Sequence, residues 1–275
     1  MIISFAIAGR RFRADLRAGQ RLSITLNFAG EQPNHFDAPP ASAAPLTLGD
    51  FIGNTRLGGS CNVSELTLVP HCNGTHTESA GHLSDDPVFI DAVLDEVFWP
   101  GTLLSVAPVP AGDSKEGYPF PLGDDEAVIT AAALQQAWER AGQSGFHQAL
   151  IIRTRPNTPD KKSRHYATQA PPFFTSEAMQ WISALDTTHL LVDIPSLDRM
   201  QDGGLLSNHR LFWGFPPESR RIAEARHPRR TVTEMIFAED AIGDGPWLVN
   251  IQIPPFRSDA APSRVMLFPL REEEA

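Results

Sequence analysis

The middle of the chain alternates twice between a helix and a short run of apolar residues, and this rhythm limits the possible folds most. Helices are predicted over 131–141 and about 176–185, from their periodicity and from an N-cap residue such as Thr130 before the first of them. The apolar runs 149–153 and 189–194 follow the helices and are predicted to be buried strands. Helices inserted between buried strands are typical of a sheet with helices packed on it.

Further strands are predicted toward both ends of the chain, over 2–7, 11–16, 22–28, 62–69, 231–236, 247–253 and 265–268. The Pro-rich segment 31–47 is predicted to be a long surface loop. Strands outnumber helices, and we find no linker that would divide the chain. We therefore expect residues 1–275 to form a single mixed α/β domain, with a mixed β-sheet core and intercalated helices.

The charge and the cysteine content exclude several classes of protein. The chain has 33 acidic and 23 basic residues and a net charge of −10, which argues against a nucleic-acid partner. Two cysteines in 275 residues exclude a scaffold stabilised by disulfides. The apolar run at the N-terminus is too short for a signal peptide, and no window of eighteen apolar residues predicts a membrane span. We expect a cytoplasmic protein with no membrane partner.

Histidine is concentrated in one short segment. His71, His76 and His82 fall within twelve residues, although the whole chain has nine histidines. Cys72 and Glu78 lie in the same segment. Histidine, cysteine and carboxylate side chains are the ligands of zinc and related divalent ions. The segment therefore predicts a metal site.

The spacing within this segment suggests which side chains share a face. In an extended backbone, residues two apart point to the same side, so Cys72, His76, Glu78 and His82 would lie together. His71 would then point away. This parity favours Cys72 over His71 as the first metal ligand, whereas a β-bulge that turns His71 to the same side is the alternative.

The run 73–82, Asn-Gly-Thr-His-Thr-Glu-Ser-Ala-Gly-His, resembles the His-x-Gly-Thr-His-x-Asp-x-Pro-x-His signature of the metal-dependent cyclase-like hydrolases. This family includes bacterial kynurenine formamidases and isatin hydrolases. Weaker similarity continues in the same order at 189–198, 208–211, 233–236 and 254–269. The resemblance implies a cyclase-like (swivelling β/β/α) fold that assembles as a homodimer or homotetramer.

The resemblance also implies roles for individual residues. It implies five metal ligands, with His71 as the alternative to the first of them: Cys72, His76, Glu78, His209 and Glu234. His82 matches the catalytic histidine that moves a proton. The implied cofactor is one or two divalent ions, Zn or Mn, which would activate a water molecule by lowering its pKa.

These roles lead to the hypothesis of a metal-dependent amidohydrolase of arylformamidase type, acting on a small amide, formamide or lactam. A lactone or ester hydrolase that uses the same site is one alternative. Cys72 stands where the family has a histidine, and Glu78 stands where it has an aspartate. These two departures motivate a second alternative, a non-catalytic metal-binding member of the fold.

Overall fold

The structure is a computed structural model that describes residues 1–273. Its α-helices are α1 (Pro70–Asn73), α2 (Ile90–Val93), α3 (Ala131–Ala141), α4 (Ser176–Ala184) and α5 (Ser207–Trp213). Short 3₁₀ helices are η1 (Thr55–Leu57), η2 (Ala80–His82), η3 (Ala111–Asp113), η4 (Pro159–Lys162) and η5 (Ile222–Glu224). In residues 1–273 no helix is long and apolar enough to cross a membrane.

The strands before α3 are β1 (Ile2–Ile7), β2 (Arg10–Asp15), β3 (Gln20–Arg21), β4 (Ser42–Pro45), β5 (Thr47–Leu48), β6 (Phe51–Ile52), β7 (Ser64–Thr67), β8 (His76–Glu78), β9 (Phe98–Val106), β10 (Val109–Pro110) and β11 (Ala127–Ile129). Those after α3 are β12 (Ala149–Thr154), β13 (Phe173–Phe174), β14 (His189–Val192), β15 (Thr231–Glu234), β16 (Gly245–Gln252), β17 (Ala260–Pro262) and β18 (Arg264–Glu272).

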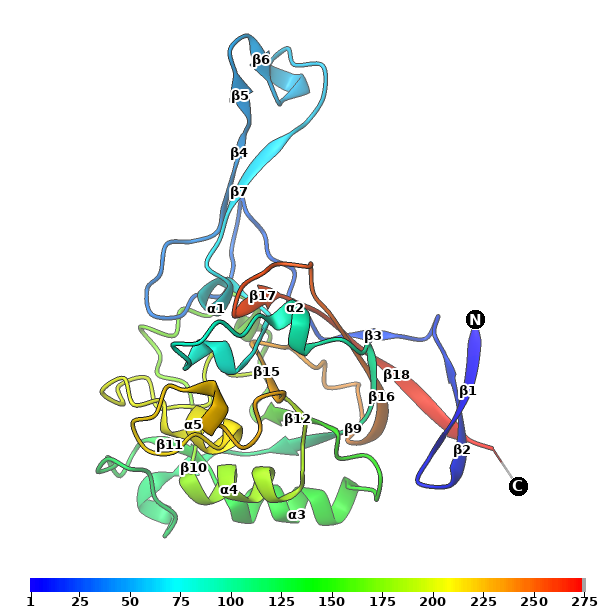
Figure 1. The fold of residues 1–275 in the computed structure, drawn as a ribbon, viewed down its shortest axis with the longest axis vertical. Coiled ribbons are helices and arrows are strands. Elements are labelled where there is room, and N and C mark those ends of the chain that lie inside the picture. The colour runs from blue at the N-terminus through cyan, green and yellow to red at the C-terminus, as the bar shows by residue number, and fades with distance from the viewer. Residues whose placement is uncertain (274–275) are drawn as a thin grey trace.

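A mixed sheet runs through the molecule (Figure 1). Within residues 1–273 it has eleven strands, in the order β1-β2-β18-β16-β9-β12-β14-β15-β8-β17, with β3 paired to β18. The central strands β9, β12, β14 and β15 are parallel, and the strands on both sides of them are antiparallel. The mixed α/β architecture predicted from the helix–strand rhythm is therefore confirmed.

The sheet separates two hydrophobic cores. Leu150 and Ile152 of β12 face α3 and α4, which cover one side of the sheet (Figure 1). Ile151, between them, faces the opposite core together with Val249 and Leu267. Successive side chains of a strand point to opposite faces, so a strand buried on both sides must be apolar throughout its length. This is why the run 149–153 could be recognised as a strand.

The two main helices begin where their capping residues predicted. Thr130 Oγ1 accepts a hydrogen bond from the Ala133 backbone N–H (3.2 Å) at the start of α3. Thr175 Oγ1 accepts one from the Ala178 backbone N–H (3.1 Å) at the start of α4. Each cap partners a backbone N–H that the first helical turn leaves free.

One expected strand is absent from residues 1–273, and one central strand was missed. Residues 22–28 form no strand in the described chain apart from an isolated bridge at Ser23. The nine-residue central strand β9 was not predicted, because Pro100 and Gly101 suggest a break. Gly101 instead permits close packing: a Cβ built there would lie 2.6 Å from the Ala149 carbonyl oxygen.

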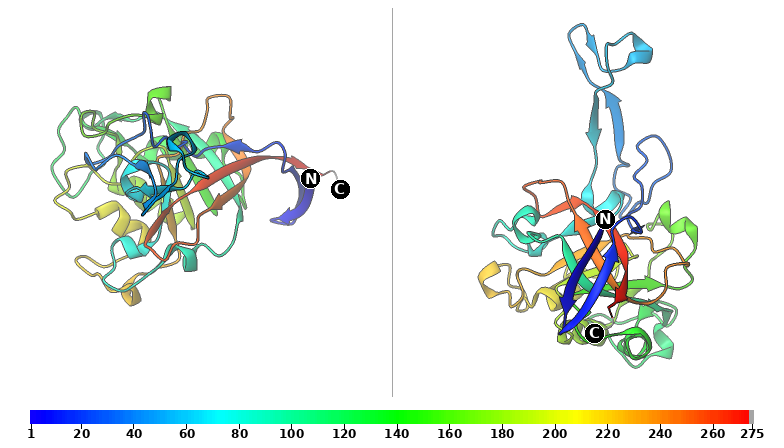
Figure 2. Two further views of the ribbon diagram at one scale, coloured as in Figure 1. Left: turned by 90° about the horizontal axis from the view of Figure 1, so that it is seen from above. Right: turned by 90° about the vertical axis from the view of Figure 1, so that its right-hand side faces the viewer.

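Residues 42–67 form an arm that projects from the body of the protein (Figures 1 and 2). Strands β4 and β7 pair as a two-stranded antiparallel ribbon, and the β5–β6 hairpin forms its outer end. The end of the segment predicted to be a loop, 31–47, is therefore part of this ribbon. Its beginning is partly buried, and His35 is among the buried residues.

Candidate metal centre

Local backbone geometry brings the histidine-rich segment together around strand β8. The chain passes from helix α1 into β8 and then into the 3₁₀ turn η2. Strand β8 is hydrogen-bonded on both sides, to β15 and to β17. The register with β15 sets Glu234 opposite His76. Helix α5 carries His209 toward the same strand, where its ring contacts Glu78.

The inner part of the cluster is buried. His209 Nε2 lies 3.0 Å from Glu78 Oε1 and 3.4 Å from Glu234 Oε1. His76 Nε2 lies 3.4 Å from the other Glu234 oxygen, Oε2. The side chains of these four residues are at most 5% exposed. Charged and polar groups removed from water to this degree require partners.

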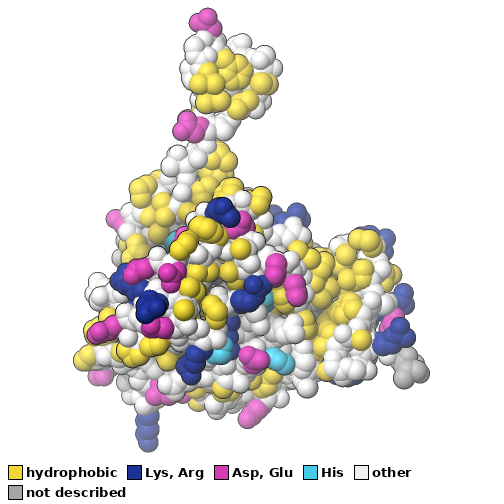
Figure 3. Space-filling view, in the orientation of Figure 1, with side chains coloured by type: hydrophobic (Ala, Val, Ile, Leu, Met, Phe, Trp, Pro, Cys, Tyr) yellow, Lys and Arg dark blue, Asp and Glu magenta, His cyan; other side chains and the backbone are white. Residues whose placement is uncertain are grey.

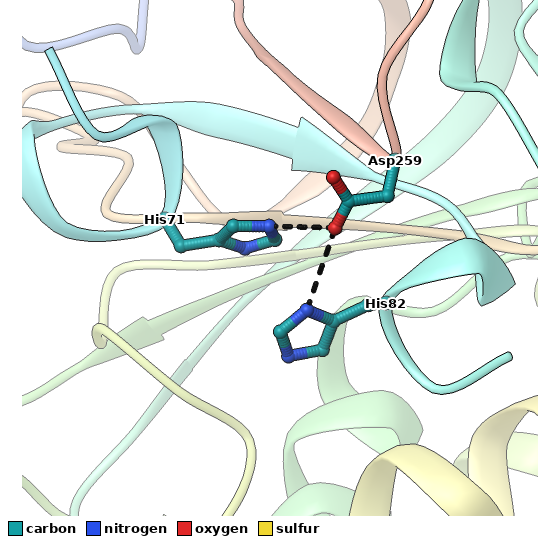
Figure 4. A group of neighbouring side chains, drawn as sticks. All are labelled: His71, His82 and Asp259. Carbon is teal, nitrogen blue, oxygen red and sulfur yellow. Dashed lines mark hydrogen bonds and ion pairs between the residues drawn. The ribbon is translucent and has the colours of Figure 1, made fainter. Parts of the chain in front are cut away.

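The outer part of the cluster is partly open to solvent. His71 Nδ1 lies 2.9 Å from Glu78 Oε2, and His82 Nδ1 lies 3.9 Å from the same atom. Asp259, which precedes β17, contacts both of these rings (Figure 4). The side chains of His71, His82 and Asp259 are 25%, 26% and 37% exposed. A small molecule would therefore approach the cluster from this side.

The expectation of an extended backbone from 72 to 82 is wrong at its beginning. Pro70 starts a helical turn that ends at Asn73, so the alternation of faces does not apply to residues 71 and 72. The structure places the His71 ring in the cluster. Cys72 is buried, and in the described chain it belongs to no group of side chains that could hold an ion. Of the two alternatives for the first ligand, the backbone geometry brings only His71 into the candidate groups of the described chain.

The buried atoms of the cluster fit a divalent cation. Four of them make no hydrogen bond within residues 1–273: His76 Nε2, Glu78 Oε1, Glu78 Oε2 and His209 Nε2. Buried polar groups are normally hydrogen-bonded, so the convergence of four such atoms needs an explanation. Within residues 1–273, three sets of ligand atoms lie within 4.8 Å of one another. Two of them include Glu78: His71, His76 and Glu78, and Glu78, His209 and Glu234. The third, on the open side, is His71, His82 and Asp259. Nitrogen and carboxylate ligands in this number suit Zn or Mn.

Hydrogen bonds around the cluster hold the ligand atoms in place. His209 Nδ1 donates to Asp198 Oδ2 (2.7 Å), and His76 Nδ1 donates to the Gly74 carbonyl oxygen (2.9 Å). Each ring therefore keeps Nε2 for the cluster. The Leu197 backbone N–H donates to Glu234 Oε1 (3.2 Å).

The carboxylates and imidazoles shift one another's pKa values. Burial alone would raise the pKa of Glu78, but the charges of His82 and His209 lower it well below its ordinary value. Burial opposes a charge on His209 too, yet Glu78 and Asp198 raise its pKa well above the ordinary value. Without a metal ion, these contacts favour the charged imidazolium form of His209 beside the Glu78 and Asp198 carboxylates. Metal binding must displace the protons from the imidazoles.

Asp259 was missed by the sequence reasoning. It follows the irregular segment 254–258, and no motif marks it. His35 is another histidine outside the predicted site. It is buried, and within the described residues neither of its ring nitrogens has a hydrogen-bond partner. Burial lowers its pKa to about 4, and the charges of Glu234 and His76 also act on it.

The mixed sheet and the His/carboxylate centre together define an α/β protein with a candidate metal site. The family model of the Cyclase family, described as "Putative cyclase", matches residues 21–199. This match covers more than half of the chain, which therefore belongs to the Cyclase family.

Solved structures with the same fold extend this match. An isatin hydrolase bound to thioisatinate is 13% identical, with a TM-score of 0.62 over 93% of this chain and 94% of that chain. Isatin hydrolase A from Labrenzia aggregata is 13% identical, with a TM-score of 0.58 over 91% and 93%. A "predicted metal-dependent hydrolase from Bacillus stearothermophilus" is 14% identical, with a TM-score of 0.57 over 91% and 97%. No curated protein matches the chain.

Proposed function

We propose that the protein is a metal-dependent hydrolase of a small amide, formamide or lactam. The observation that carries the proposal is the convergence of buried ligand atoms from His76, Glu78 and His209, which make no hydrogen bond within residues 1–273, beside a partly exposed histidine, His82. Membership in the Cyclase family and a fold shared with isatin hydrolases support this assignment.

The proposed roles are metal binding by the candidate ligands and proton transfer by a histidine on the open side of the cluster. His71, His76, Glu78, His209 and Glu234 would hold one or two Zn or Mn ions. A divalent ion at this position would supply a Lewis acid and lower the pKa of a bound water. His82 is placed to accept a proton from the attacking water and to donate it to the leaving nitrogen, since its ring lies beside Glu78 on the open side of the cluster.

The proposal is tested by metal analysis and a substrate screen. Protein purified without an affinity tag should contain one or two equivalents of Zn or Mn by mass spectrometry, and it should hydrolyse isatin or an aryl formamide. Glu78→Ala should lose the metal and at least about 100-fold in kcat/KM. Glu239→Ala, which removes an exposed carboxylate paired with Lys162, is the matched control.

A wild-type protein without metal, or a Glu78→Ala variant with unchanged activity, would overturn the proposal. The same screen on matched lactones and esters separates an amidohydrolase from a lactone or ester hydrolase at this site. A protein that binds metal but hydrolyses none of these compounds would indicate a non-catalytic member of the family.

We also propose that two or four copies of the chain associate through the arm of residues 42–67. The arm exposes large apolar side chains, which gather at its outer end (Figure 3): Leu48 and Leu57 are 64% and 62% exposed, and Leu66 on β7 is 54% exposed. A two-stranded ribbon is marginally stable by itself in water and needs further cover. The same arm on a second copy would supply a self-complementary apolar partner under two-fold symmetry.

A further inference from the structure

One oxygen of Asp259 contacts two histidines of the cluster (Figure 4). Asp259 Oδ2 lies 2.9 Å from His71 Nε2 and 3.6 Å from His82 Nδ1. The other nitrogen of His71, Nδ1, faces Glu78. Asp259 therefore contacts His71, a candidate metal ligand, at the nitrogen opposite the one that faces Glu78. It contacts His82, the proposed proton carrier, at Nδ1.

The backbone fixes Asp259 to the strand that carries Glu78. The Asp259 carbonyl oxygen accepts hydrogen bonds from the Ser79 backbone N–H (2.9 Å) and from Ser79 Oγ (3.2 Å). The next residue, Ala260, pairs with Glu78 in the sheet. On the side chain, Ser258 Oγ donates to Asp259 Oδ1 (3.1 Å), which leaves Oδ2 for the two rings.

The two rings need such a fixed acceptor. The centroids of His71 and His82 lie 4.4 Å apart, and the rings are tilted by 32°. Two imidazoles this close repel each other when both are protonated. The rings alone also do not determine which nitrogen of each one points toward the cluster. A carboxylate that binds one nitrogen of an imidazole leaves the opposite nitrogen to face the reacting atoms or a metal.

We propose that Asp259 is a positioning residue that orients both histidines. It holds His71 through Nε2, so that Nδ1 is presented to the metal beside Glu78. It holds His82 through Nδ1, so that Nε2 is left to transfer the proton. This inference rests on the proposed function, and it adds a residue that couples metal binding to proton transfer.

The test compares Asp259→Asn and Asp259→Glu with the wild type and with Asp95→Asn. Asp95 is an exposed carboxylate paired with Arg229, so its variant removes one charge away from the cluster. Zn²⁺ affinity is measured by chelator competition on the metal-free proteins, and kcat and KM are measured at saturating Zn²⁺. The thermal midpoint of each metal-free variant checks its folding.

Asp259→Asn should bind Zn²⁺ about 10- to 100-fold more weakly. At saturating Zn²⁺ its kcat should fall at least about 10-fold while KM changes little, because proton transfer rather than binding is affected. Asp259→Glu, which keeps the charge, should recover part of both losses, and Asp95→Asn should match the wild type. A merely structural role would lower the thermal midpoint and leave Zn²⁺ affinity and the kcat–KM pattern unchanged.

Wild-type Zn²⁺ affinity or wild-type kcat in Asp259→Asn would overturn this inference and leave the proposed hydrolase intact. The proposed function itself fails on different results, namely a wild-type protein that binds no metal or a Glu78→Ala variant that remains active. The two failures are therefore distinguishable.

Discussion

Asp198 accepts a 2.7 Å hydrogen bond from His209 Nδ1 and thereby turns the other nitrogen of that ring toward Glu78. The same carboxylate accepts hydrogen bonds from the Tyr118 hydroxyl (2.7 Å) and from the Asn208 backbone N–H (2.7 Å). Burial, followed by the Asp198 charge, raises the pKa of Tyr118 far above its ordinary value, so the hydroxyl remains a donor. Asp198 is thus an anchor for one histidine, and Asp259 is one for two others.

Removal of this anchor should weaken metal binding. We expect Asp198→Ala to lower Zn²⁺ affinity by about 10- to 100-fold, because His209 loses the partner that orients it. Chelator competition on the metal-free protein measures the effect. Tyr118→Phe removes a different contact of the same carboxylate and should lower the affinity by less than Asp198→Ala does. Equal affinities of Asp198→Ala and the wild type would contradict the assignment.

Metal binding should release protons at neutral pH. Burial disfavours a charge on His71, but the hydrogen bonds to Asp259 and Glu78 outweigh it and raise its pKa to about 10. The pKa of His209 is raised as well. Both imidazoles therefore carry protons at pH 7.5 until a metal displaces them. Calorimetric Zn²⁺ titrations in buffers of different ionisation enthalpy should show release of at least about one proton per ion; zero release would refute the charge state described here.

The raised pKa of His71 also predicts how the stability of the metal-free protein changes with pH. The folded pKa of His71 lies above the ordinary value of about 6.5, so its contribution to stability is fully present below about pH 6.5. It is lost as the pH rises toward 10. Urea midpoints of the metal-free wild type should therefore fall between pH 7 and 10 by more than those of a His71→Gln variant. Parallel curves for the two proteins would contradict this prediction.

A buried ion pair outside the cluster should contribute to the stability of the fold but not to metal binding. Lys161 Nζ lies 2.8 Å from Asp193 Oδ2, and both side chains are at most 4% exposed. Lys161→Ala should lower the free energy of unfolding by about 3–5 kcal/mol, because it leaves a buried carboxylate without its partner. Its neighbour Lys162 pairs with Glu239 at the surface, so Lys162→Ala should cost less than about 1 kcal/mol. Urea denaturation measures both, and loss of metal in Lys161→Ala would place the pair in the site instead.

Shortening the arm should change the oligomeric state of the protein and leave the candidate metal centre intact. Pro45 and Ser64 face each other in the ribbon, so residues 46–63 can be replaced by an Asn-Gly turn. We expect the shortened protein to keep its metal and to have a lower molar mass by light scattering than the full chain. An unchanged mass would place the interface elsewhere. Leu66→Asp, which puts a charge on the ribbon without shortening it, serves as a second test.

The sequence predicted the parts of the fold that depend on neighbouring residues, such as helix caps and strands that are apolar throughout. The helices after Thr130 and Thr175 start at their capping side chains, and β12 is apolar because it is buried on both faces. Strand β9 escaped prediction because Gly101 is required by tertiary packing against β12 and β16, which the local sequence does not reveal. The arm was only half predicted, since its strands are exposed and lack the alternation of a buried strand.

The candidate site was predictable where a motif spans it. His76, Glu78 and His82 were marked by their spacing, and His209 and Glu234 by resemblance to the family; the structure brings all five together. The prediction of Cys72 over His71 assumed an extended backbone, but a helical turn begins at Pro70 and His71 is the residue that lies in the cluster. Asp193, which lies in the segment 189–198 that resembles the family, is bound by Lys161 and Thr154. Asp259 reaches the site through the pairing of β17 with β8, which no local signal encodes.

The position of Glu78 at the centre of strand pairing has a mechanical consequence. Its strand is bonded on one side to β15 and on the other to β17, and its carboxylate contacts histidines from α1 and α5. An ion held there would act as a cross-link among segments that lie far apart in the sequence, much as a disulfide does in a secreted protein. Because the ligand set comes from three segments that lie far apart in the sequence, around residues 71–78, 209 and 234, the protein's resistance to unfolding would depend on its supply of metal.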